Sequence, residues 1–319
     1  MGERTSVTVR VEQMEIVADV ASLPRYERPP EQVIATPQLP LFHAIPYDES
    51  EAAIAASALS QGSKQLLRGL LRLGATRVFP GGGAGIEYGS LLKTAVRPEF
   101  VGPHVREAAE HLQQARVDVV LVPGMSGYPV GAMYSAVAGI PAILLKKQRL
   151  SESRGDYPPG AFVIPSYTGE GDVVMSADLD AVQDIVDGIL GPQIALQADE
   201  PSLALTIRVA GADDIIDKAT MSQAVGESAV VLGRASAERC IRRHRNETGD
   251  ARPIAVTVEV VAWVTPIIKG YNRPHDHLLR LFNLRPFAGI NVTSLHLDPR
   301  AIGVDGLGVV AFAADYAWS

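Results

Sequence analysis

The chain has 319 residues, of which 47% are hydrophobic and 20% are charged, and its net charge is −7 at pH 7. This length and apolar content predict one large or two small globular domains with a sizeable buried core. The acidic balance argues against a general binder of nucleic acids or of membrane surfaces. The single cysteine, Cys240, leaves no internal disulfide to form and fits a reducing compartment.

The first twenty residues carry charges every few positions and contain no apolar segment of signal-peptide length. No window of the chain approaches about 18 uninterrupted apolar residues, the length that a membrane-spanning helix needs. We therefore expect no membrane partner and a cytoplasmic location.

Taken in chain order, apolar periodicity and turn signals predict strands that alternate with helices. Strands are expected at 5–20, 75–79, 117–124, 140–147, 203–214 and 253–268, and helices at 48–73, 103–115, 128–139 and 179–190. A hairpin is expected within 161–176, a largely helical stretch at 218–250, and a short helix with two strands in the remainder. The strand, helix and strand from 117 to 147 form a βαβ unit. The sequence therefore predicts an α/β fold with a parallel sheet flanked by helices.

In an open parallel sheet, ligands bind where the carboxyl ends of strands meet loops. This rule selects four candidate segments: 80–89, 124–131, 146–149 and 213–221. The first, which begins PGGG, could approach a substrate closely or could be only a loop. It lacks the spacing of a dinucleotide-binding fingerprint.

The second segment turns sharply from a strand into a helix. Backbone N–H groups of Ser126, Gly127 and Tyr128 would face outward beside the helix N-terminus, which is a ready anion site. The alternative is that the glycines only make a tight turn. At the end of the next strand, Lys146 and Lys147 could neutralise a phosphate or diphosphate, or could be a solvated strand end.

The fourth segment places Asp213 and Asp214 at the carboxyl end of a strand. Adjacent extended residues point to opposite sides, so one carboxylate can meet a ligand hydroxyl while the other holds a metal-bound water. Residues 217–220 could surround a phosphate with backbone N–H groups and the hydroxyl of Thr220. The alternative is that these aspartates only cap a helix N-terminus.

Three further features were weighed. His275 and His277 flank Asp276 and could share a metal, but the sequence offers no evident third ligand. Cys240 lies in a helical pattern and is interpreted as a buried core residue rather than a nucleophile. The chain contains no G-x-S-x-G, Walker or C-x-x-C motif.

Two runs occur together in one known family. The run from 88 to 148 resembles the central part of adenine phosphoribosyltransferase and its type I relatives. The shared features, in chain order, are a Leu-Leu loop, a helix, a buried strand, a diphosphate-binding turn, a small-residue helix and a strand ending in basic residues. The run TIRVAGADDIIDKATM, from 206 to 221, resembles the type I signature, particularly its hypoxanthine-guanine variant. The two motifs have the family's order, with a longer insertion between them.

This resemblance implies a type I phosphoribosyltransferase-like core at 81–268, with an insertion near 149–203. The extensions 1–80 and 269–319 would build a hood over it. The implied reaction is the displacement of diphosphate from 5-phosphoribosyl 1-diphosphate, with Mg²⁺, by a purine-like base or another nitrogenous acceptor, in a role that could belong to specialised metabolism.

The resemblance also assigns roles by matching positions. Asp213 and Asp214 would hold the ribose hydroxyls and, through water, the Mg²⁺ ion, and Asp217 would be an acid or base at the acceptor. The 5′-phosphate loop would be Asp217, Lys218, Ala219 and Thr220, and the diphosphate would meet Ser126, Gly127, Tyr128 and Lys146 or Lys147.

The phosphate loop departs from the family because it lacks glycines, and Ala219 would adopt the left-handed conformation poorly. The diphosphate turn has Ser126 where many relatives have a basic residue. A non-catalytic sensor or regulator of nucleotides or phosphoribosyl diphosphate is therefore the alternative hypothesis, and a nucleotide-cleaving enzyme on the same fold is a third. We expect a homodimer, which is the common default. We expect no nucleic-acid partner, because the basic stretch 239–252 is weak evidence for one in a chain of net charge −7.

Overall fold

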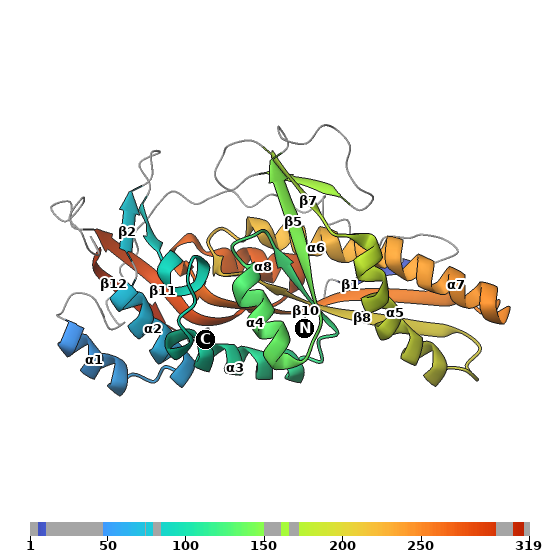
Figure 1. The fold of residues 1–319 in the computed structure, drawn as a ribbon, viewed down its shortest axis with the longest axis horizontal. Helices are drawn as coiled ribbons and strands as arrows, with labels where there is room; N and C mark the ends of the chain where they lie inside the picture. Colours follow the sequence, from blue (N-terminus) through green and yellow to red (C-terminus); the bar gives the residue numbers. More distant parts are fainter. Residues whose placement is uncertain are drawn as a thin grey trace.

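The computed structural model describes residues 6–10, 47–73, 75–78, 84–149, 161–165, 172–297 and 309–315 (Figure 1). Its helices are α1 (Tyr47–Ala56), α2 (Gln61–Leu73), α3 (Pro98–Gln114), α4 (Tyr128–Ala138), α5 (Leu179–Leu196), α6 (Thr220–Val231), α7 (Glu238–Thr248) and α8 (Pro274–Phe282). Its strands are β1 (Ser6–Arg10), β2 (Ala75–Val78), β3 (Ala84–Glu87), β4 (Val119–Pro123), β5 (Ala142–Arg149), β6 (Phe162–Pro165), β7 (Asp172–Ser176), β8 (Leu203–Ala212), β9 (Ile215–Ile216), β10 (Ile254–Ile268), β11 (Phe287–Leu297) and β12 (Val309–Asp315).

One large sheet organises the described chain. Its strand order is β12-β11-β10-β8-β4-β5-β7-β6, and the central pairs from β11 to β5 are all parallel. Antiparallel pairs close both edges, where β12 joins β11 and the β6–β7 hairpin joins β5. β1 pairs antiparallel with the first half of β10, β9 pairs parallel with its end, and β2 and β3 form a separate hairpin. The predicted α/β class, a parallel sheet flanked by helices, is confirmed.

Helices cover both faces of this sheet (Figure 1). On one face, α2, α3 and α4 share a hydrophobic core with alternate residues of β4, such as Val120 and Val122. On the other face, α5, α6, α7 and α8 share a second core with the residues between them, such as Val119 and Leu121. β4 is buried along its whole length because its side chains enter the two cores in turn.

Local signals explain several element boundaries. α4 begins with Tyr128 and Pro129 and ends at Gly139, which has φ 69°. Asp178 caps α5 by accepting hydrogen bonds from the N–H groups of Asp180 and Ala181. The chain thus passes from β4 into α4 and from β7 into α5 within a few residues.

Several predicted elements differ in extent, and α3 begins at Pro98, five residues before the predicted helix 103–115. The single helix expected at 48–73 is two helices, α1 and α2, and their junction contains Ser60, whose hydroxyl accepts from the N–H of Ser63 and donates to Glu107 on α3. The helix expected at 179–190 continues to Leu196, past Pro192. The strand expected at 5–20 is described only at 6–10, and the rest of it lies outside the described residues.

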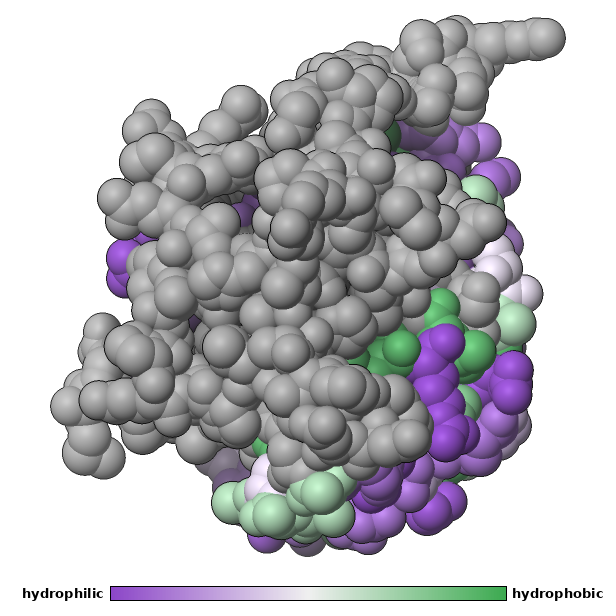
Figure 2. Space-filling view, turned by 90° about the vertical axis from the view of Figure 1, so that its left-hand side faces the viewer, coloured by the Kyte–Doolittle hydropathy of each residue, from purple (hydrophilic) through white to green (hydrophobic). Residues whose placement is uncertain are grey.

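The predicted division into core, insertion and hood is described only in part. α2 packs against α3 and β11, so this part of the N-terminal extension lies directly on the core. Residues 11–46 and 298–308 of the two extensions lie outside the described residues, and the hood stays a prediction. At the end of the molecule that carries α1 and α2, the described surface is mainly hydrophilic (Figure 2). None of the described helices combines the length and apolar character needed to cross a membrane.

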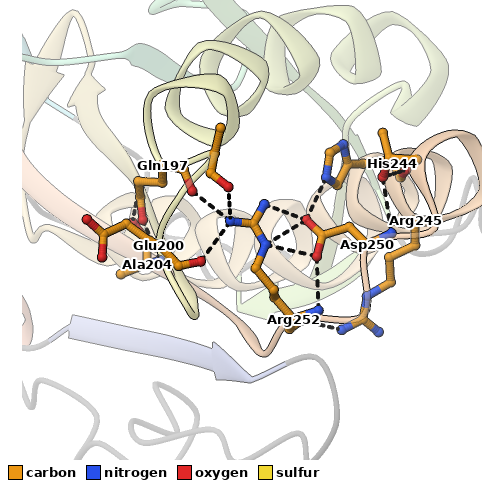
Figure 3. A network of polar contacts seen from close by, with 9 residues as sticks. Gln197, Glu200, Ala204, His244, Arg245, Asp250 and Arg252 are labelled. Atoms are coloured by element: carbon orange, nitrogen blue, oxygen red, sulfur yellow. Dashed lines mark hydrogen bonds and ion pairs between the residues drawn. The ribbon is translucent and has the colours of Figure 1, made fainter.

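A polar network fixes the end of α5 to the start of β10 (Figure 3). Arg252 pairs with Asp250 through Nε and Nη2, at 2.6 to 3.0 Å. Its Nη1 donates to the carbonyl groups of Gln197, Ala198 and Glu200. These carbonyl groups belong to the residues that directly follow α5, so Arg252 fixes the chain where it leaves this helix.

Candidate functional site

The candidate site lies at the carboxyl ends of β4, β5 and β8, which are neighbouring parallel strands. The turn from β4 to α4 runs from Gly124, with φ 69°, to Gly127. Gly127 lies against Asp213 at the end of β8, since a Cβ atom placed at Gly127 would be 2.9 Å from Asp213 Oδ1. The structure therefore brings together the glycine turn and the acidic motif, which are more than 80 residues apart in the sequence.

The two candidate lysines of β5 diverge. Side chains alternate along a strand, so Lys146 and Lys147 point to opposite faces. A Cβ atom at Gly124 would lie 3.7 Å from Lys147 Cδ, which places Lys147 over the turn. The charge of Lys147 partly offsets the rise in the pKa of Asp213. Lys146 is exposed on the other side and is not brought to the site.

The rest of the turn is positioned by backbone contacts. The Tyr128 hydroxyl donates to the carbonyl oxygen of Leu145 at 2.7 Å, which ties the start of α4 to β5. Ser126 is half-buried, and Met125 beside it is 72% exposed. Ser126, Gly127 and Tyr128 thus occupy the predicted strand-to-helix turn, next to Asp213.

Asp213 and Asp214 are both buried, with exposures of 7% and 1%. The N–H of Asp214 donates to Oδ1 of Asp213 at 2.9 Å. Burial, followed by the negative charge of Asp214 and a side-chain hydrogen bond to it, raises the pKa of Asp213 well above its usual value. The raised pKa favours the protonated form of Asp213. The two adjacent carboxyl groups are called the Asp213–Asp214 dyad below.

A set of aromatic and imidazole groups lies behind Asp214. The Tyr88 hydroxyl donates to Asp214 Oδ2 at 2.9 Å. Tyr134 of α4 is fully buried, and burial and the charge of Asp214 raise the pKa of its hydroxyl. His104 of α3 lies 2.8 Å from that hydroxyl through Nε2. The sequence gave no signal for the contact between Tyr88 and Asp214, or for Tyr134 and His104.

Asp217 is held by the segment after β10. Lys269 Nζ donates to Asp217 Oδ2 at 2.9 Å, and the amide of Asn272 donates to Oδ1. The backbone N–H of Lys269 also donates to the carbonyl oxygen of Ile216. Lys269 and Asn272 were missed in the sequence, although Lys269 follows a predicted strand and the strand-end rule could have selected it.

The candidate phosphate loop ends in a left-handed residue. Ala219 has φ 56° and is 4% exposed, and its carbonyl oxygen accepts from the N–H of Ser222 in the first turn of α6. Lys218 is half-buried, and Thr220 is the first residue of α6. The loop thus makes the turn that a glycine would make freely, with an alanine in place of it.

The dyad was also predicted to hold Mg²⁺ through water. Within the described part of the chain, no group of three or more His, Cys, Asp or Glu side chains could hold a metal ion by itself. Magnesium in phosphate-handling sites is usually bound by one or two carboxylates together with substrate phosphates and water. Asp213 and Asp214 supply two adjacent carboxyl groups, and a cation would relieve the repulsion between them. These residues fit a magnesium ion that is shared with a diphosphate.

The remaining candidates do not join this site. His275 and His277 lie on α8, and the structure assembles no third metal ligand around them among the described residues. Cys240 is buried on α7, where burial raises the pKa of its thiol to about 11. A neutral, buried thiol is the core residue that the sequence predicted. Residues 79–83 of the glycine-rich candidate loop lie outside the described residues.

No family model and no curated protein matches the chain. Among solved structures, the chain is similar to adenine phosphoribosyltransferase from Giardia lamblia in complex with 9-deazaadenine, at 13% identity and a TM-score of 0.42, over 70% of this chain and 96% of that one. It is similar to the Rhodothermus marinus enzyme at 13% identity and a TM-score of 0.40, over 70% and 97% of the two chains. The Trypanosoma brucei enzyme, in complex with AMP, pyrophosphate and ribose-5-phosphate, matches at 12% identity and a TM-score of 0.41, over 79% and 86%. The identity is too low to transfer substrates or residue roles from these enzymes.

Proposed function

We propose that the chain is a magnesium-dependent phosphoribosyltransferase, which moves the 5-phosphoribosyl group from phosphoribosyl diphosphate to a purine-like base or another nitrogenous acceptor. The observation that carries this proposal is the contact between Gly127 and the Asp213–Asp214 dyad at one sheet edge. Strand-end turns bind anions through backbone N–H groups, and paired carboxylates bind hydroxyl groups or a hydrated cation. A sugar that carries phosphates needs both kinds of group within reach of one another.

In this proposal each group has a distinct task. The turn at Ser126 and Gly127, with Lys147, binds the diphosphate. Asp213 and Asp214 hold the ribose hydroxyls and the magnesium, which offsets negative charge on the departing diphosphate. Ribose binding has to displace the Tyr88 hydroxyl from Asp214 or use the second oxygen of that carboxylate.

The bond changes in this reaction require orientation more than covalent help from the protein. The bond from the ribose C1 atom to diphosphate breaks, a bond from C1 to the acceptor nitrogen forms, and the acceptor nitrogen loses a proton. In this proposal Asp217, which forms an ion pair with Lys269, receives that proton as the general base. Fixing the two reactants in one geometry supplies much of the rate enhancement.

The alternative function, a non-catalytic sensor, is favoured by one observation. Asp214 is only 1% exposed and already bonded to Tyr88, and the phosphate loop is closed by Ala219 rather than glycine. A closed, preformed site of this kind could bind a nucleotide without turning it over. Release of diphosphate in the presence of adenine, hypoxanthine or guanine distinguishes the two functions, since a sensor binds without releasing it.

The first experiment is calorimetric titration with phosphoribosyl diphosphate, with and without Mg²⁺. The wild-type protein should bind in a magnesium-dependent manner, and Asp213→Asn should bind about tenfold or more weakly, since hydrogen bonds to charged groups contribute about 1.5–3 kcal/mol. Asp184→Asn, an exposed position on α5, is the matched control and should bind as the wild type does. Binding that ignores both magnesium and the Asp213 substitution contradicts the proposal.

A further inference from the structure

Asn291 of β11 lies at the same sheet edge, next to the segment that holds Asp217. β11 pairs parallel with β10, and Asn291 is the partner of Ile268, the last residue of β10. The following residues, Lys269 and Asn272, are the two that hold Asp217. Asn291 is therefore level with this polar cluster and on the neighbouring strand.

The side chain of Asn291 is buried, with 7% exposure, and its Oδ1 atom has no hydrogen-bond partner within the described part of the chain. Buried carbonyl groups are almost always paired, because an unpaired one has lost its hydrogen bonds to water without replacement. The unpaired Oδ1 atom of Asn291 lies at a strand end, beside the segment that holds the candidate catalytic residue Asp217. A ligand bound there would supply the hydrogen-bond donor that this atom lacks.

Gly270 makes room for this amide group. A Cβ atom at Gly270 would lie 3.0 Å from Cγ and 3.2 Å from Nδ2 of Asn291, and closer still to Oδ1. Any larger residue at 270 would therefore displace the carboxamide. The turn that Gly270 begins is fixed by hydrogen bonds from Asn272 N–H to the Lys269 carbonyl and from Arg273 N–H to the Gly270 carbonyl. The carboxamide of Asn291 and the carboxylate of Asp217 thus both contact this one turn.

We infer that Asn291 recognises the acceptor, by pairing its carboxamide with the edge of a planar nitrogen heterocycle whose reacting nitrogen faces Asp217. This inference rests on the proposed function. A carboxamide has one acceptor and one donor side by side, so it complements an edge on which an N–H lies next to a carbonyl or a ring nitrogen. Nucleobases with an exocyclic amino or oxo group carry such edges, and unsubstituted purine does not carry one on its six-membered ring.

The test compares ligands that differ only in this edge. Calorimetry measures the affinity of the protein for adenine, for hypoxanthine and for unsubstituted purine, with and without phosphoribosyl diphosphate and Mg²⁺. We expect the wild type to prefer adenine or hypoxanthine to purine by about tenfold or more, as expected of a site built to hydrogen-bond its ligand. Asn291→Leu, which has a similar shape and no amide, should abolish this preference and leave the affinity for phosphoribosyl diphosphate unchanged.

Other outcomes overturn the inference. If Asn291→Leu raises the Tm and leaves the preference intact, the orphan oxygen is only a packing defect. If the wild type binds all three bases equally, or binds none of them, Asn291 recognises no heterocyclic edge, and this result needs no variant to fold. Loss of phosphoribosyl diphosphate binding in the wild type refutes the proposed function instead, and a base preference that depends on Asn291 would survive that result.

Discussion

Ala219 adopts a left-handed backbone at the end of the candidate phosphate loop, with φ 56°. For an L-residue with a Cβ atom this conformation costs about 1–2 kcal/mol. The methyl group is buried in the core around α6, which compensates part of that cost. Backbone strain of this kind persists where the surrounding structure holds it, and it is common at ligand-binding turns.

A glycine at this position should be tolerated unusually well. Ala219→Gly relieves about 1–2 kcal/mol of strain and loses a buried methyl group worth about 0.8 kcal/mol and about 0.5–1 kcal/mol of chain entropy. The free energy of unfolding, measured in urea, should therefore remain within about 1 kcal/mol of the wild type. Ala224→Gly is the matched control, because Ala224 is buried in the interior of α6, and it should lose about 1.5 kcal/mol. Equal losses in the two variants would contradict strain at Ala219.

At this scale, the residues that could be predicted are those that directly follow a strand in the sequence. Gly127, Lys147, Asp213 and Asp214 were selected in this way, because strand order and turn chemistry are local signals. Tyr88 reaches Asp214 across 126 positions of the chain, and no local signal carries such a contact. The orphan amide of Asn291 was likewise invisible, because only the packed structure shows which polar atoms lack a partner.

α5 is an element whose end depends on one distant side chain. Arg252 donates to three carbonyl groups that follow its last turn and pairs with Asp250 (Figure 3). Gln197 at the same end exchanges hydrogen bonds with the backbone of Ala204 on β8. The planar guanidinium serves the carboxylate and the three carbonyl groups at once, whereas an ammonium group has only three N–H donors and no planar fork.

Arg252→Lys should therefore loosen this end of the molecule while conserving its charge. We expect faster amide hydrogen exchange at residues 194–204, with little change in the cores. Arg239→Lys is the control, since Arg239 makes one exposed ion pair with Asp180, and such pairs contribute little. If the two variants exchange alike, the three carbonyl contacts of Arg252 do not stabilise α5.

Most elements could be predicted, because their periodicity or continuous apolar runs are strong. The break between α1 and α2 was missed, because it is made by Ser60 and by Glu107 of a different helix. The apolar run 228–232 would also suit a strand from its local sequence, and it forms the end of α6 and the first residue of the π-helix that follows. In both places tertiary contacts decided between two conformations that the local sequence allows.

At the scale of the whole molecule, the sheet separates two cores, and the candidate site lies along the edge where they meet. Asp213 and Asp214 end a strand whose residues alternate between these cores, as in Ala210 on one side and Val209 on the other. The order of the strands could not be read from the sequence, since β10 neighbours β8, β9, β11 and β1 at once. Which strands pair over such distances in the chain depends on which apolar faces are still uncovered once the individual helices and strands have formed.

The core beneath the site makes the stability of the whole molecule sensitive to acid. His104 is fully buried between Tyr134 and Phe287, and burial lowers its pKa to about 3 from a usual value of 6.5. The folded state keeps this imidazole neutral, whereas the unfolded chain gains a proton below pH 6.5. The contribution of His104 to the free energy of unfolding is therefore complete above pH 6.5. It is lost as the pH falls toward 3, by up to about 1.4 kcal/mol per pH unit.

His104→Gln should flatten this dependence on pH. The free energy of unfolding is measured in urea at pH 7.5, 6 and 5. Between pH 7.5 and pH 5 the wild type should lose about 2 kcal/mol more of this free energy than the variant loses. The variant should keep a smaller slope, because burial also lowers the pKa of His277, to about 4. His277→Gln measures that second contribution separately. If the free energies of unfolding of the wild type and of His104→Gln fall in parallel with pH, the buried His104 contributes nothing to the pH dependence of stability.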